Sequence, residues 1–103
     1  MATSARRYSQ AVFSIASEKD EIDKWLSEME NATLILSDND CIAFFDAEQI
    51  PIDVKLEGVK KLFSKNIGLI QNLISLMITR KDISKFLEVS NIFTSMADEY
   101  KGI

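Results

Sequence analysis

Apolar residues recur at intervals of three and four along most of this chain, and little interrupts that spacing. The 103 residues include only three glycines and one proline, so the chain offers few of the tight turns that join β-strands. Strand-like alternation of apolar and polar residues is nearly absent. The sequence therefore predicts an all-α fold, and its length fits a single domain, residues 1–103, with one hydrophobic core.

Turn signals divide the chain into six predicted helices, and the short connections between them favour a bundle in which neighbours fold back on one another. Ser4 is placed to cap the first helix, Asp23 to complete a capping box in the second, and Asp82 to cap the sixth. Pro51 suits the first turn of the fourth helix, and Gly102 ends the sixth. The predicted helices cover approximately residues 4–18, 21–36, 38–45, 51–64, 67–79 and 83–101.

The same spacing predicts which face of each helix is buried. The stripe of the second helix comprises Ile22, Trp25, Leu26, Met29, Thr33 and Leu36. That of the fourth comprises Val54, Leu56, Val59, Leu62 and Phe63. That of the sixth comprises Ile83, Phe86, Leu87, Ser90, Phe93, Met96, Ala97 and Tyr100.

The first and fifth helices carry more apolar surface than one buried face requires. In each, the apolar residues cover roughly 200° of the helix circumference, whereas packing on one side of a core needs a little over 100°. The residues concerned are Ala5, Tyr8, Ala11, Val12, Phe13, Ile15 and Ala16 in the first helix, and Leu69, Ile70, Leu73, Ile74, Leu76, Met77 and Ile78 in the fifth. Either both helices are covered on all sides, or part of each stripe forms a groove for an amphipathic partner helix. Periodicity alone does not choose between these alternatives.

The residues that most often carry chemistry are missing. There is no histidine and no glycine-rich phosphate loop. The acidic segment 37–40 resembles a calcium loop superficially, but Ala43 and Gln49 stand where an EF-hand needs Gly and Glu, so a helix-capping turn is predicted there. We therefore expect no metal, no cofactor and no catalysis, although a small enzyme remains a third, weaker alternative.

The net charge and the hydropathy of the chain argue against some classes of partner and location. The net charge is −4 and the basic residues cluster only in pairs, which argues against nucleic acid. The longest apolar run, 67–78, is too short to span a membrane, and the chain begins without a signal peptide. The single cysteine, Cys41, is expected to pack as a small apolar residue in a reducing compartment.

Several segments together resemble one known family. They are ARRYSQAVFSIA, KDEIDKWLSEM, IPIDVKLEGVKKLF with its Pro51 and Lys55, QNLISLMITRKDISKFLEVSNIF, and DEYKGI. In order and spacing they are similar to the N-terminal domain of the delta subunit of bacterial and chloroplast F-type ATP synthases, whose mitochondrial equivalent is the oligomycin sensitivity-conferring protein. One departure is the turn at 79–83, which lacks the glycine usual in the family, so its backbone geometry is expected to differ.

The resemblance implies a non-catalytic stator subunit that holds the catalytic head of the ATP synthase to its peripheral stalk. Its expected partners are the N-terminal helix of an alpha subunit, bound between the first and fifth helices, and the b subunit, bound by a C-terminal domain that this chain lacks. The isolated domain is expected to be a monomer, peripheral to the cytoplasmic face of a bacterial membrane or the stromal face of a thylakoid. The groove residues carried over are Tyr8, Ala11, Val12, Ile15, Asn72, Leu73, Leu76 and Met77, with Thr79 and Arg80 near the rim. The alternative function is an unrelated helical regulatory module that binds a peptide.

Overall fold

The computed structural model describes residues 3–102, and over that range it contains six α-helices, one short 3-10 helix and no strand. The elements are α1 (Ala5–Glu18), α2 (Ile22–Leu36), α3 (Asn39–Asp46), α4 (Ile52–Leu62), α5 (Gly68–Thr79), η1 (Ile83–Lys85) and α6 (Phe86–Lys101). The predicted all-α, six-helix fold is confirmed.

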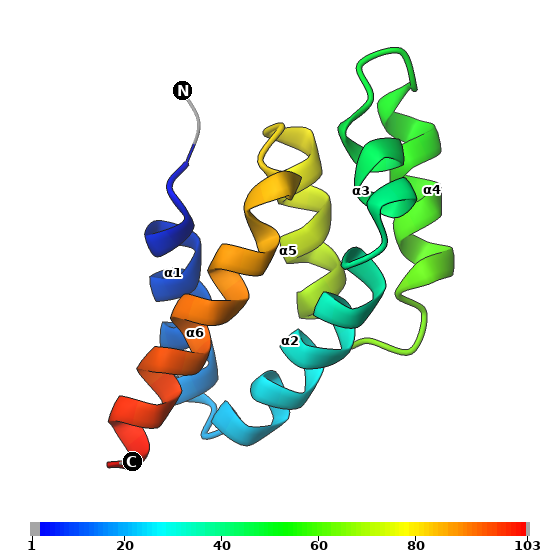
Figure 1. Ribbon diagram of the computed structural model, residues 1–103. Coiled ribbons are helices and arrows are strands. Elements are labelled where there is room, and N and C mark those ends of the chain that lie inside the picture. The colour runs from blue at the N-terminus through cyan, green and yellow to red at the C-terminus, as the bar shows by residue number, and fades with distance from the viewer. Residues whose placement is uncertain (1–2, 103) are drawn as a thin grey trace.

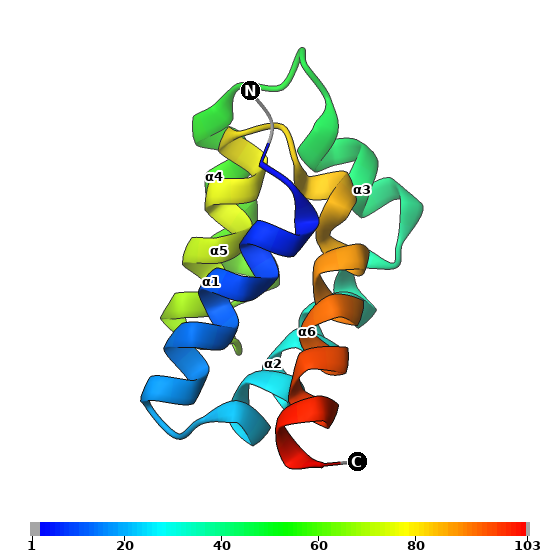
Figure 2. The ribbon, with the colours of Figure 1, turned by 90° about the vertical axis from the view of Figure 1, so that its left-hand side faces the viewer.

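The long helix α6 organises the bundle. It lies between α1 and α2 and packs against both (Figure 1). On the other side of the molecule, α4 packs on α5, and α3 packs on η1 and on the end of α2. Figure 2 looks onto the face where α1 lies beside α5.

Aromatic side chains join these helices in the core. Phe93 of α6 is fully buried, and its ring lies 5.7 Å from that of Phe13 and 6.4 Å from that of Trp25, measured between ring centroids. A second aromatic contact, between Phe45 and Phe63 at 6.4 Å, ties α3 to the end of α4. The two contacts of Phe93 therefore join α1 and α2 to α6.

Ser9 interrupts the apolar arc of α1, yet it is fully buried where α1 packs on α6. Its hydroxyl oxygen lies 2.8 Å from the Ala5 carbonyl oxygen and 3.0 Å from the Val89 carbonyl oxygen. The hydroxyl is therefore hydrogen-bonded despite its burial, and its small size lets the two helices approach closely.

Three predicted helix caps are confirmed. The Ser4 hydroxyl accepts a hydrogen bond from the Arg7 amide at the start of α1. The Asp38 carboxylate accepts bonds from the first amides of α3, so segment 37–40 is a capping turn. Gly102 ends α6 in the left-handed conformation, with φ of 76°.

Two predicted caps are wrong. No capping box forms in α2: the N-cap is Glu21, which makes no side-chain capping bond, so Asp23 stands two residues after the cap, and it pairs with Lys101 of α6. Asp82 does not cap α6 with its side chain: η1 intervenes, and the carboxylate is occupied by Tyr8. In the turn before it, which lacks the family's glycine, Lys81 adopts a left-handed backbone with φ of 61°.

The buried face of α4 also differs from the prediction. Val54 and Leu62 are exposed, whereas Lys55, Val59 and Phe63 are buried. Residues four apart lie only about 40° apart around a helix, so these three share one face. The aliphatic stem of Lys55 occupies the first position of that face. The prediction considered only apolar residue types, so it placed the buried stripe partly on the wrong face of α4.

Candidate partner-binding groove

A shallow apolar depression of about 220 Å³ lies between α1 and α5, above one residue of α2. We call it the α1/α5 groove; α1 and α5 can be followed side by side in Figure 2. Its lining consists of Tyr8, Ala11, Val12 and Ile15 from α1, Trp25 from α2, and Leu69, Asn72, Leu73 and Leu76 from α5. None of these nine side chains is charged.

The groove has a packed floor and an open rim. Tyr8, Val12, Trp25 and Leu73 are buried and form the floor. On the rim, Leu76 leaves 45% of its surface exposed, so part of its side chain is available to a partner.

The wide apolar stripe of α1 serves two surfaces. Its Phe13 edge packs on α6, with ring centroids 5.7 Å from Phe93 and 6.0 Å from Tyr100. Its Ala11 edge is exposed and borders the groove. The alternative in which α1 and α5 are covered on all sides is therefore wrong for this structure.

The structure brings together seven of the ten residues expected at the groove: Tyr8, Ala11, Val12, Ile15, Asn72, Leu73 and Leu76. The other three do not line it. Met77 is fully buried in the core, because it follows Leu76 by about 100° around α5. Thr79 lines a different depression, and the Arg80 guanidinium donates to the Thr3 hydroxyl at 2.8 Å.

Two lining residues were missed by the sequence analysis of the groove. Leu69 belongs to the apolar stripe of α5, one turn before Leu73, so the spacing of that stripe could have identified it. Trp25 arrives from α2, and no local pattern predicts which helix lies beneath two others.

A buried hydrogen-bond network fixes the Tyr8 end of the groove. The Tyr8 hydroxyl donates to Asp82 Oδ2 at 2.6 Å, and the Thr3 amide donates to the same oxygen at 3.1 Å. The Lys85 ammonium lies 3.3 Å from Asp82 Oδ1. Burial by itself raises the pKa of Asp82, but these three partners outweigh it, and the net pKa lies below the ordinary value. Burial, and secondly the hydrogen bond to Asp82, raise the pKa of Tyr8.

The Asp82 network predicts acid sensitivity. Because the folded-state pKa is lowered, Asp82 stabilises the fold fully above the unfolded carboxyl pKa, near pH 4, and loses that contribution as the pH falls through the folded-state value. We expect Asp82→Asn to lower Tm at pH 7 by several degrees and the difference from the wild type to shrink steadily below about pH 4. Thermal unfolding from pH 2 to pH 7 measures this. A difference that stayed constant to pH 2 would contradict the assignment.

The family described as ATP synthase delta (OSCP) subunit matches residues 5–103, which is nearly the whole chain. The chain belongs to this family. The resemblance stated from the five segments is thereby confirmed.

Delta subunits from several bacteria show the same relationship. The chain is 30% identical to ATP synthase subunit delta of Geobacter sp. (strain M21) over 96% of this chain and 57% of that protein. It is 31% identical to that of Syntrophomonas wolfei, over 96% of this chain and 56% of the relative, and 28% identical to that of Lactiplantibacillus plantarum, over 98% and 56%. The chain thus spans a little more than half of the length of these delta subunits. No solved structure matches it.

Metal-ligand clusters and membrane spans are two further kinds of feature that residues 3–102 of this delta-family chain could contain. Within that range, no three His, Cys, Asp or Glu residues gather as potential metal ligands. Nor is any helix there both long enough and apolar enough to cross a membrane.

Proposed function

We propose that this chain is a non-catalytic stator component of an F-type ATP synthase and that its α1/α5 groove receives the N-terminal helix of an alpha subunit. Membership in the delta (OSCP) family supports the complex, and the uncharged, partly exposed lining of the groove supports a helical partner. The observation that carries the proposal is this groove, formed by the two helices whose apolar stripes exceed the needs of the core.

The spacing of the lining residues suits a helix. Tyr8, Ala11, Val12 and Ile15 recur at intervals of three and four, and so do Leu69, Asn72, Leu73 and Leu76. The two rows line the same depression, in which the apolar face of an amphipathic helix can place residues at i, i+3, i+4 and i+7. The small side chain of Ala11 lets the backbone of the guest helix approach α1 closely.

In this proposal, residues 1–103 contact the catalytic head, and the contact with the peripheral-stalk b subunit belongs to a C-terminal domain of the delta subunit. The domain acts as a monomer. It is located peripherally, on the cytoplasmic face of a bacterial membrane or the stromal face of a thylakoid.

Affinity capture tests this function. Immobilised wild-type chain is expected to retain ATP synthase head subunits, the alpha subunit among them, from a lysate of the source organism. Leu76→Glu, on the groove rim, should lose them. Leu34→Glu should retain them, because Leu34 is 71% exposed on α2 and lies outside the groove. Capture of another partner without head subunits would support the regulatory alternative and contradict the proposal.

A further inference from the structure

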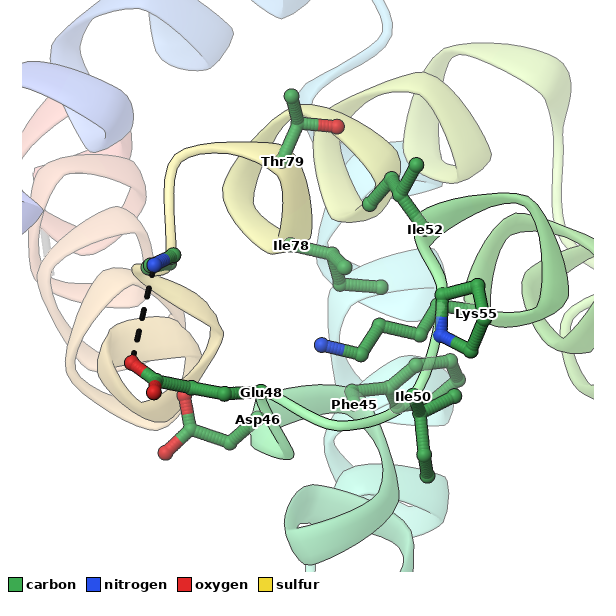
Figure 3. Close-up of a pocket in the computed structure, with 10 residues that line it drawn as sticks. Phe45, Asp46, Glu48, Ile50, Ile52, Lys55, Ile78 and Thr79 are labelled. Atoms are coloured by element: carbon green, nitrogen blue, oxygen red, sulfur yellow. Dashed lines mark ion pairs between the residues drawn. The ribbon is translucent and has the colours of Figure 1, made fainter.

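A second depression, of about 600 Å³, lies where the loop between α3 and α4 faces the end of α5. Figure 3 shows its residues, and we call it the Lys55 pocket. One part of its wall is apolar and includes Phe45, Ile50 and Ile78, and the rest is polar or charged. It shares only α5 with the α1/α5 groove, and none of the lining residues is common to both.

The side chain of Lys55 is the unusual feature of this pocket. Only 8% of the residue surface is exposed, and its ammonium has no hydrogen-bond or ion-pair partner among residues 3–102. Figure 3 shows it extending into the hollow, with Ile78 on one side and Phe45 on the other. The aliphatic stem of Lys55 is buried, whereas its ammonium opens onto the hollow, so an anion that enters from outside the chain can pair with it.

The other charges at the pocket define which anion fits. The Lys81 ammonium lies 3.7 Å from Glu48 Oε1, and both side chains are largely exposed, so this pair contributes little. Asp46 also lines the pocket, and among residues 3–102 it has no cation partner. The Asp46 and Glu48 carboxylates repel a phosphate dianion more strongly than a monoanion. Phosphate sites also supply several N–H donors or an arginine. The Lys55 ammonium, unpaired within residues 3–102 and beside an apolar wall, therefore suits a single carboxylate on an apolar stem.

We propose that the Lys55 pocket binds a carboxylate carried on a short aliphatic stem, with the Lys55 ammonium as counter-ion and the stem against Phe45 and Ile78. The carboxylate can come from a free aliphatic acid or from an acidic side chain flanked by apolar residues in a partner protein. Both sources present the same chemistry to the pocket. The site is independent of the α1/α5 groove, so the failure of either proposal leaves the other standing.

Titration of the isotope-labelled chain, followed by NMR, tests the site. Hexanoate is expected to give saturable shifts in the Lys55 side-chain signals and in the amides of Ile52 and Ile78. Hexanamide, which has a similar shape but no charge, should bind at least about tenfold more weakly. Lys55→Met should abolish the preference for hexanoate. The matched control is Lys61→Met, which removes the same charge from an exposed position on α4 and should keep the preference.

Two blocked tripeptides identify the source of the carboxylate. They are acetyl-Leu-Glu-Leu-amide and its Gln analogue. Tighter binding of the Glu tripeptide than of hexanoate would support the site with a protein side chain as its ligand, and the reverse order would support it with a free acid. If Lys55→Met fails to fold by circular dichroism, the acid and amide comparison on the wild type still decides. Equal binding of hexanoate and hexanamide, shifts that never saturate, or full affinity in folded Lys55→Met would overturn the proposal.

Discussion

Replacing Phe93 with alanine is expected to lower the free energy of unfolding by about 3–5 kcal/mol. Phe93 is fully buried and packs against Phe13 of α1 and Trp25 of α2. Its removal leaves a cavity where three helices meet. A domain of this size is stable by only about 5–15 kcal/mol, so this is the largest effect that we expect from a single substitution. Urea denaturation followed by circular dichroism measures it.

Leu87→Ala is the control, because Leu87 lies on the same helix and is exposed. We expect that change to cost about 0.5 kcal/mol or less. If Phe93→Ala cost no more than Leu87→Ala, the packing of α1 and α2 on α6 through this ring would be wrong.

In the α1/α5 groove, Leu76→Glu and Ala11→Trp are each expected to weaken binding of an alpha-subunit N-terminal peptide by at least about tenfold, or about 1.4 kcal/mol. Leu76→Glu places a charge in an apolar contact, and Ala11→Trp fills the space in which the guest backbone would lie. Both positions are exposed in the free chain, so Tm should change little. Isothermal titration calorimetry gives the affinity, and thermal unfolding gives Tm.

Leu34→Glu serves as the matched control for Leu76→Glu, because it introduces the same charge at an exposed leucine outside the groove. It should leave both affinity and Tm near the wild-type values. Native affinity together with a collapsed Tm in Leu76→Glu or Ala11→Trp would mean that these residues serve the core.

The helices themselves were predictable because their signals are local. Ser4, Asp38 and Gly102 act through bonds and dihedrals within a few residues, and each cap formed as predicted. The predicted Asp82 cap did not form. Its carboxylate instead accepts a hydrogen bond from Tyr8, which is far away in the sequence. The burial of Lys55 was not predicted because charged residues are normally exposed, whereas here its stem continues the stripe of Val59 and Phe63.

The groove was predictable in part. Periodicity showed that α1 and α5 carry excess apolar surface, but their adjacency came from the family resemblance. Within α5, Leu76 and Met77 have similar side chains in adjacent positions, and only the packing of the helix shows that one is exposed and the other is fully buried. Trp25 entered the lining through tertiary structure, which no pattern within a single helix contains.

The most direct test of the central claim is an NMR titration of the labelled chain with the N-terminal peptide of the alpha subunit from the same organism. We predict saturable shifts concentrated in the amides of α1 and α5 that border the groove, including those of Ala11, Asn72 and Leu76, and helix formation in the peptide. Shifts concentrated on α3 and α4, or no saturable shifts as the peptide concentration is raised, would contradict the account.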